Sequence, residues 1–425
     1  TSFGIESYLN NKFKKYEKLY DITLSKEDSL TVRFSNIIEA AYEKTGQRVA
    51  VLIDEYDSPL QHSWNTSEHI GCTNVYRNVF AVLKSATKYE KFVFITGITK
   101  FTQISLFSVL NNLTNISFLP EYATICGITE QEVTEYFTED ISLLAGANGW
   151  TEQETHKRLK EYYDGYHFCD KNMTDIYNPF SFINALKHKR ISNYWAASGA
   201  TILLPKFISD MEIKLDNFDN CSILRNTLET SDVTDGGAEL FLFQSGYLTI
   251  KHADEFGYIL CFPNEEVRQA LYDMVLPTLT MRAESETQSL QASLFRQLGT
   301  GQLNEAKNTL KSLIADVPYS NKKLASMDME ERYRLIISSI LNAIGFRVEV
   351  ERMLATGRID IVAYSYGYIY VMELKLSNNG GMLAAKEQIL NNKYLAPFKA
   401  DKRKVIGLAI ELDEKGKGLI DWDEV

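Results

Sequence analysis

The sequence predicts an α/β protein in which two α/β modules are separated by a mainly helical stretch. Two short apolar runs, residues 49–53 and 91–95, flank a segment at 73–87 whose apolar residues recur at helical spacing. A buried strand, a helix and a second buried strand in this order predict a parallel sheet. Near the C-terminus an apolar helical stripe is followed by several strand-like runs, which predicts a second, mixed α/β module.

The pattern changes twice along the chain, which divides it into three predicted parts. Residues 1–128 form the first module and residues 326–425 form the last one. Residues 129–315 are predicted to be mainly helical, because capping boxes open helices there, with a strand pair near 241–262. A boundary is expected at Asp316–Ser326, where proline and polar residues interrupt the helical pattern.

Composition indicates a cytoplasmic protein with no membrane association. No run of about 20 apolar residues, the length that spans a bilayer, occurs, and the N-terminus lacks the features of a signal peptide. The five cysteines are scattered without a Cys-x-x-Cys pair. This usage is typical of reduced thiols and argues against a disulfide framework or a zinc site. The sequence does not determine the oligomeric state.

The negative charge is concentrated before the last module. The chain has a formal net charge of −11, whereas residues 326–425 carry 14 basic and 15 acidic residues, a net charge of −1. The preceding residues therefore carry −10. So acidic a chain is not typical of a dedicated DNA-binding protein, but a nearly neutral module with a local basic patch can hold phosphate.

The C-terminal module is predicted to begin with a helix at 328–344. Its apolar stripe runs from Tyr333 to Ile344, and Gly345 ends it. Glu330 extends this stripe by one turn, so we expect its carboxylate to point towards the sheet, where it needs a positive partner. The following elements are predicted as strands at 346–351, 358–364, 368–375 and 404–411 with a helix at 382–394, and the acidic end 421–424 as a solvated terminus.

Three chemically reactive side chains are predicted to converge in this module. Asp360 stands near the start of one strand, and Glu373 and Lys375 lie on the same face of the next strand. If the hairpin turns near Gly367, Asp360 is the cross-strand neighbour of residue 373 or 374. The pattern therefore predicts two carboxylates and one amine around a small area.

This grouping suits a metal-dependent hydrolase. Two carboxylates and the backbone carbonyl of Leu374 are ligands for Mg²⁺ or Mn²⁺; such an ion polarises a scissile phosphate and activates a bound water. A neighbouring lysine positions the water or offsets charge on the phosphate. An isolated Glu-x-Lys is more often a sheet edge with a surface salt bridge, and the order of helix, strands and helix favours the catalytic interpretation.

Residues 326–425 resemble the restriction-endonuclease-like PD-(D/E)XK nuclease domain found at the C-terminus of AAA-ATPase-like proteins. Asp360 stands where that family has the aspartate of the PD pair, although Ile359 replaces the proline, and Glu373-Leu374-Lys375 stands for (D/E)XK. The resemblance implies catalytic support from Glu330 and from Gln388 on the following helix. It also implies phosphate-facing charge from a set of basic residues: Lys386, Lys393, Lys399, Lys402, Arg403 and Lys404.

The first module carries a Walker B-like strand. Residues 49–53 deliver Asp54 to the end of a buried strand, where it is placed to hold Mg²⁺, and Glu55 to orient a water. The next predicted strand is followed by Thr96, which is placed to sense a γ-phosphate. The series of sequence motifs from LIDEYDSPL to FPNEEVRQAL resembles the AAA-ATPase-like domain of the same family. That resemblance implies a P-loop NTPase core with a helical extension.

A phosphate loop of the form GxxxxGK[ST] does not occur, so the predicted core is truncated. The family carries this loop upstream of residue 1, and truncation and true loss both remain open. ATP is therefore expected as a cofactor only of an intact parent protein, and ATP hydrolysis is not expected of this chain.

The primary hypothesis is a Mg²⁺- or Mn²⁺-dependent nuclease that acts on DNA and is regulated by an ATPase-like domain. The alternative is a nucleotide switch or scaffold protein whose C-terminal domain binds nucleic acid or a partner without cleavage. The sequence does not determine the substrate form or the sequence preference.

Overall fold

A computed structural model describes residues 1–23, 28–63, 66–98, 112–195, 218–230, 237–280, 284–315 and 328–425. The chain divides into two units, each made of segments that are separate in sequence: Thr1–Ile125, Phe168–Met173 and Ser222–Leu260 form unit 1, and Cys126–His167, Thr174–Cys221 and Cys261–Val425 form unit 2. The boundary predicted at Asp316–Ser326 lies outside the described residues. The three-part division stays a prediction.

Unit 1 contains the parallel strand pair that the sequence predicts. Strand β1 (Val49–Ile53) pairs with β2 (Glu90–Ile95) in parallel. The helix expected between them begins earlier and is divided at Ala81 into α4 (His69–Phe80) and α5 (Val82–Ser85). The remaining elements before β2 are α1 (Ser2–Leu19), α2 (Leu30–Thr45) and α3 (Ser58–Ser63).

A three-stranded sheet with the order β5-β7-β6 also lies in this part of the chain. The strand pair predicted near 241–262 is wrong in its first part, because Gly237–Gln244 forms helix α13 with four consecutive buried apolar residues. A continuous apolar run fits a buried helix as well as a buried strand. The other elements are η2 (Pro120–Tyr122), β5 (Cys221–Leu224), α12 (Arg225–Thr230), β6 (Thr249–Ala253) and β7 (Gly257–Cys261).

The first part of unit 2 is helical, as predicted. Thr129 and Glu132 form a reciprocal capping box at the start of α7, and the helices enclose a core that includes Leu144, Leu159 and Phe182. The elements are β3 (Ile128–Thr129), α7 (Glu130–Tyr136), α8 (Thr138–Asn148), α9 (Glu152–Tyr163), β4 (Ile176–Tyr177), α10 (Pro179–His188), η4 (Phe218–Asn220), α14 (Glu265–Thr280), α15 (Glu284–Gly299) and α16 (Leu303–Ala315).

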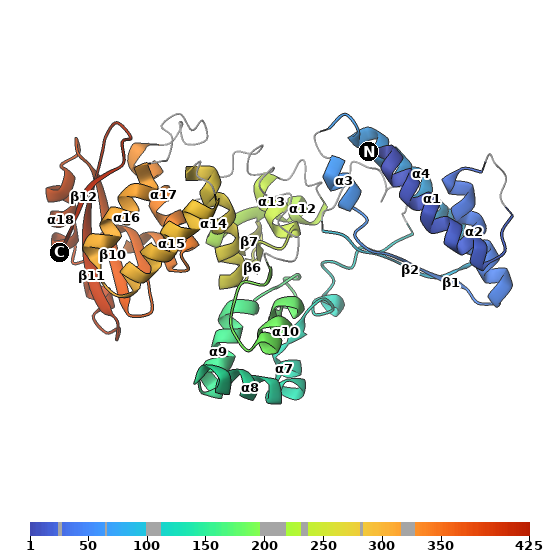
Figure 1. Ribbon diagram of the computed structural model, residues 1–425, viewed down its shortest axis with the longest axis horizontal. Helices are drawn as coiled ribbons and strands as arrows, with labels where there is room; N and C mark the ends of the chain where they lie inside the picture. The colour runs from blue at the N-terminus through green and yellow to red at the C-terminus, as the bar shows by residue number, and fades with distance from the viewer. Residues whose placement is uncertain are drawn as a thin grey trace. The chain divides into compact units, whose positions relative to one another are not determined.

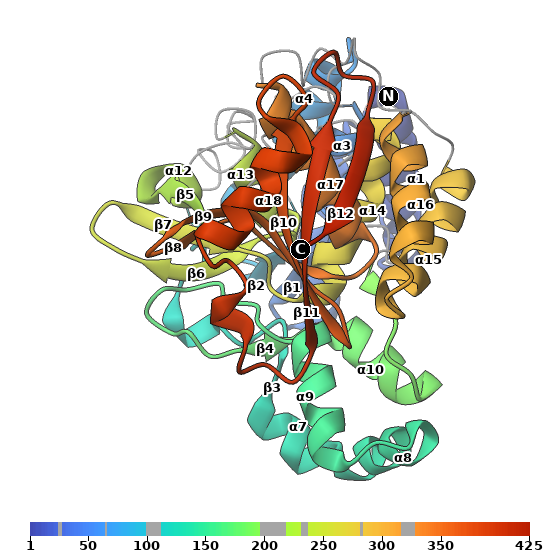
Figure 2. The same ribbon diagram turned by 90° about the vertical axis from the view of Figure 1, so that its left-hand side faces the viewer.

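The last hundred residues form a five-stranded mixed sheet with the order β12-β11-β10-β9-β8. Strands β10 and β11 are parallel, and the other neighbours are antiparallel. Figures 1 and 2 show α18 on one face of the sheet and α16 and α17 on the other. The elements are α17 (Met329–Ala343), β8 (Arg347–Leu354), β9 (Gly357–Tyr364), β10 (Tyr368–Leu376), α18 (Gly381–Asn391), η5 (Ala396–Phe398), β11 (Lys404–Leu412) and β12 (Leu419–Glu424).

The prediction of a solvated terminus at the acidic end of the chain is wrong. It forms β12, which pairs with β11, and Trp422 is buried there while its acidic neighbours remain exposed. Alternation places the tryptophan towards the core and the carboxylates towards solvent. No helix in the described part of the chain is long and apolar enough to cross a membrane.

Candidate active site

The hairpin of β9 and β10 brings the two predicted carboxylates together. Met372 is opposite Ile361 in the antiparallel register, and the backbone N–H of Leu374 donates a hydrogen bond of 2.9 Å to Asp360 Oδ2. Asp360 is 5% exposed and Glu373 is fully buried. The strand pairing therefore holds two acids in an interior where their charge is costly.

The amine of Lys375 is the point where the other predicted residues meet. Its Nζ donates to Glu373 Oε1 at 2.9 Å and to the Leu374 carbonyl at 3.0 Å. It also lies 3.5 Å from Oε1 of Glu330, which α17 contributes. The structure thus brings Glu330, Asp360, Glu373 and Lys375 into one polar centre, which we call the acidic centre.

Burial and the repulsion between neighbouring carboxylates shift pKa values in the acidic centre. Burial raises the pKa of Glu373, and the nearby Asp360 carboxylate raises it further, against the opposing effect of Lys375. Burial by itself would lower the pKa of Lys375, but its hydrogen bond to Glu373 and the surrounding carboxylates produce a net increase. Additional positive charge would therefore stabilise the ionised carboxylates.

One atom of the acidic centre suits a further cation. Within the described residues, Oε2 of Glu373 is buried without a hydrogen-bond partner. The same described residues contain no group of three or more His, Cys, Asp or Glu side chains arranged to hold a metal. Two carboxylates and the Leu374 carbonyl fit a Mg²⁺ or Mn²⁺ ion that keeps several waters.

Gln388 lies on α18, as predicted, but its side chain has a different partner. Its Nε2 donates to the hydroxyl of Tyr394 at 3.1 Å, and this hydroxyl donates to the Arg358 carbonyl at 2.8 Å. Arg358 precedes Asp360 by two residues in β9. Gln388 is thus connected to the strand that carries Asp360, and its hydrogen bond goes to Tyr394 rather than to a carboxylate of the acidic centre.

Arg334 and Glu351, which the sequence did not predict as site residues, complete the surroundings of Asp360. Arg334 Nη1 lies 3.6 Å from Asp360 Oδ1, and its Nη2 lies 3.0 Å from Glu351 Oε1. Arg358 also contacts Glu351, at 2.9 Å. The position of Arg334 four residues after Glu330, hence on the same helix face, is a signal that could have identified it.

Glu351 has no comparable sequence signal. It lies in β8 between the pairs Val350–Ile361 and Arg352–Ile359, with a φ of +52°. This left-handed conformation is rare for a residue with a Cβ. In this conformation Glu351 pairs with Arg334 of α17 and Arg358 of β9. These contacts depend on the tertiary structure.

The N-terminal candidate residues lie at the ends of β1 and β2. Asp54 Oδ1 accepts a hydrogen bond from the Thr96 hydroxyl, and both residues lie where parallel strands end at the same sheet edge. Glu55 is exposed and has a φ of +51°. The structure therefore brings Asp54 and Thr96 together, and Glu55 follows Asp54 directly in the chain.

Comparison with protein families agrees with this geometry. Residues 328–422 match the PD-(D/E)XK nuclease superfamily. The PD-(D/E)XK domain thus corresponds to the part of the chain from α17 to β12. Residues 2–107 match a family described as predicted AAA-ATPase. The chain therefore has an AAA-ATPase-like region at its N-terminus and a PD-(D/E)XK superfamily domain at its C-terminus.

A curated relative is described as "Uncharacterized protein in vnfD 5'region" from Azotobacter chroococcum mcd 1. It is 27% identical over 405 residues, which cover 91% of this chain and 74% of the relative. No solved structure matches this protein.

Proposed function

We propose that the PD-(D/E)XK domain is a Mg²⁺- or Mn²⁺-dependent nuclease that hydrolyses phosphodiester bonds in DNA. The observation that carries this proposal is the convergence of Asp360, Glu373 and Lys375 from adjacent strands, with Lys375 2.9 Å from Glu373. A surface salt bridge would not need two buried carboxylates, whose desolvation is costly. A centre that binds a cation and a phosphate uses both carboxylates.

Asp360, Glu373 and the Leu374 carbonyl would hold the metal ion. The ion, when bound, supplies Lewis-acid activation of the phosphate and lowers the pKa of a water. Glu373 Oε2 offers a buried lone pair to a cation. The Leu374 N–H keeps Asp360 oriented through its hydrogen bond to Oδ2.

Lys375 has the role of positioning the attacking water and offsetting charge on the phosphate. In hydrolysis, water adds to phosphorus, the bond to the leaving oxygen breaks, and that oxygen takes up a proton. An ammonium group next to the reacting phosphate stabilises the negative charge that develops on it. Glu330, 3.5 Å from the amine, limits the directions in which Lys375 can point, and Gln388 supports the start of β9 through Tyr394.

The test is cleavage of supercoiled plasmid by the full chain in Mg²⁺ or Mn²⁺. We expect nicking that EDTA abolishes and that Asp360→Ala and Lys375→Ala each reduce at least 100-fold, as removal of a group that stabilises the transition state commonly does. Glu387→Gln, an exposed carboxylate on α18, is the matched control and should cleave normally. Equal cleavage by the wild type and by both centre variants would reject the proposal.

We further propose that the AAA-ATPase-like region regulates this activity in a nucleotide-dependent way in a chain with a complete phosphate loop. The pairing of Asp54 with Thr96 at the strand ends supports a role for Asp54 in holding Mg²⁺–nucleotide, with Glu55 as the water-orienting acid. This chain, which lacks a phosphate-loop sequence, should show less than 1 °C of thermal shift with ATP and Mg²⁺. A shift of several degrees would contradict that expectation.

A further inference from the structure

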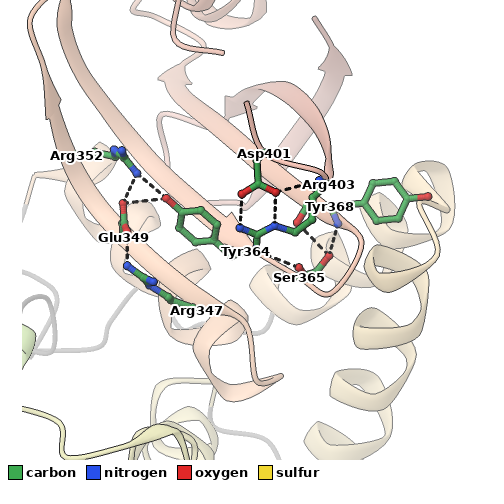
Figure 3. A network of polar contacts seen from close by, with 8 residues as sticks. All are labelled: Arg347, Glu349, Arg352, Tyr364, Ser365, Tyr368, Asp401 and Arg403. Carbon is green, nitrogen blue, oxygen red and sulfur yellow. Dashed lines mark hydrogen bonds and ion pairs between the residues drawn. The ribbon is translucent and has the colours of Figure 1, made fainter. Parts of the chain in front are cut away.

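Arginine side chains gather around Tyr364, the last residue of β9 (Figure 3). Arg347 and Arg352 come from β8, and Arg403 comes from the segment before β11. The guanidinium groups of Arg347 and Arg403 lie 5.3 Å and 5.2 Å from the ring centroid of Tyr364. The guanidinium of Arg352 lies 4.8 Å from the ring centroid of Phe398. These five residues form what we call the arginine–aromatic cluster, in which planar cations lie over ring faces.

Two carboxylates fix these arginines in place. Glu349 accepts from Arg347 at 2.8 Å and from Arg352 at 2.7 Å, and Asp401 accepts two hydrogen bonds from Arg403, at 2.9 Å and 2.7 Å. A guanidinium has five N–H donors, so these contacts leave donors on each arginine for another partner. Cations that are already ordered lose less conformational entropy when they bind a ligand.

The neighbouring loop adds exposed positive charge. Lys399, Lys402 and Lys404 are exposed, so this surface holds six cationic residues against the carboxylates of Glu349 and Asp401, a net charge of +4 in a chain whose net charge is −11. Such a local excess attracts polyanions in spite of the overall negative charge.

An exposed aromatic residue lies beside this charge. The backbone N–H of Lys404 donates to the carbonyl of Gly367, so the loop adjoins the turn at the tip of the β9–β10 hairpin. Tyr366, next to Gly367, is 90% exposed. Its ring is available to stack on a base of a nucleic acid.

The surface shares strand β9 with the acidic centre. Tyr364 follows Asp360 by four residues in β9, and Arg347 pairs with Tyr364. At about 3.3 Å per residue the separation is roughly 13 Å, which corresponds to about four base pairs at about 3.4 Å each.

We propose that the arginine–aromatic cluster, with Lys399, Lys402, Lys404 and Tyr366, is a surface that binds the phosphate backbone of the nucleic acid that the acidic centre cleaves. The inference rests on the proposed nuclease function, and it names the groups that hold the substrate about four nucleotides from the scissile phosphate. The arginines and lysines contact phosphates, which gives affinity without sequence preference.

The test measures binding without cleavage. A fluorescent DNA oligonucleotide, as duplex and as single strand, is titrated with the full chain in EDTA at several salt concentrations. Lys402→Gln combined with Lys404→Gln should weaken binding roughly 10-fold and reduce the slope of log K against log salt by about 1.4 to 1.8, because two phosphate contacts are lost. Lys14→Gln combined with Lys15→Gln, two exposed lysines of α1, is the control with the same charge change.

Tyr366→Ala separates the two forms of substrate. A loss of roughly 5- to 150-fold in single-strand affinity, the range for one base stack, identifies an unpaired strand at this surface, whereas an unchanged affinity together with the lysine effect identifies a duplex. Equal affinity and equal salt slope for the two lysine pairs and the wild type would overturn the inference. Failure of the nuclease proposal is seen separately, as cleavage that survives Asp360→Ala.

Discussion

Arg334 and Asp360 form an ion pair across the helix–sheet interface, with Nη1 and Oδ1 3.6 Å apart. Their side chains are only 13% and 7% exposed. Arg334 also contacts Glu351, so a single guanidinium balances two carboxylates. A buried carboxylate without such a partner carries a large desolvation penalty, which makes α17 part of the electrostatic support of the acidic centre.

Substitution of Arg334 by methionine should lower the free energy of unfolding by about 2–4 kcal/mol in EDTA, because it leaves Asp360 without its cation. Urea denaturation measures this. The loss should be smaller in Mn²⁺, which would supply positive charge to the same carboxylates. Arg296→Met, at an exposed position of α15, should change stability by less than about 0.5 kcal/mol. Identical urea midpoints for the two variants would contradict the expectation.

The backbone at Glu351 gives a second prediction. With a φ of +52°, alanine is strained there by roughly 1–2 kcal/mol, whereas asparagine adopts the left-handed region more readily. Both substitutions remove the contacts with Arg334 and Arg358, so Glu351→Asn should be more stable than Glu351→Ala by about 1 kcal/mol. Urea denaturation of the pair tests this, and a more stable alanine variant would be inconsistent with the left-handed backbone.

Asp164 gives a prediction about pH. It is 1% exposed at the end of α9, and burial raises its pKa from 3.8 to about 6, although Lys160 lies 3.5 Å away. Because the folded state binds this proton more tightly, the contribution of Asp164 to stability is complete below pH 3.8 and is lost as pH rises through about 6.

Asp164→Asn should therefore match the wild type near pH 3.5 and exceed its unfolding free energy by about 3 kcal/mol at pH 8, at about 1.4 kcal/mol per pKa unit. Thermal denaturation across this pH range is the measurement. Glu387→Gln serves as the exposed control and should leave the difference from the wild type independent of pH. If the difference in unfolding free energy between Asp164→Asn and the wild type were also independent of pH, the raised pKa of Asp164 would be disproved.

The burial of Trp422 gives a prediction about the stability that the last strand, β12, contributes. It is 4% exposed in β12, so Trp422→Ala should destabilise the chain by about 3–5 kcal/mol. Asp423→Ala removes an exposed ion pair with Lys386 and should cost less than about 1 kcal/mol. Similar urea midpoints for both variants would mean that β12 contributes little to the fold.

Much of the C-terminal fold could be predicted because its elements have strong local signals. The apolar stripe of α17, its terminating glycine and the alternation of β9 and β10 are each visible within a short window. The β9–β10 pairing follows from a short hairpin, and the proximity of Asp360 to Glu373 and Lys375 follows from that pairing. The position of Glu330 on the helix face predicted a carboxylate that points towards the sheet and needs a positive partner, and in the structure Lys375 Nζ lies 3.5 Å from it.

Other parts depend on contacts that a local window does not contain. The short acidic segment at the terminus becomes a strand because β11 offers a free edge and Trp422 can be buried there. The run at 240–243 is apolar throughout, and the length and period of such a run do not distinguish a strand from a helix. Gln388 donates to Tyr394, six residues later, rather than towards the strands.

The sequence by itself determined which side chains could form a catalytic centre and that two adjacent strands would carry them, because pleat and helix periodicity are local properties of the backbone. Only the tertiary structure decided that Arg334 and Glu351 surround Asp360 and that the arginine–aromatic cluster forms around Tyr364, four residues after Asp360 in β9. Those contacts join separate elements, and their geometry is set by how the helices pack on the sheet.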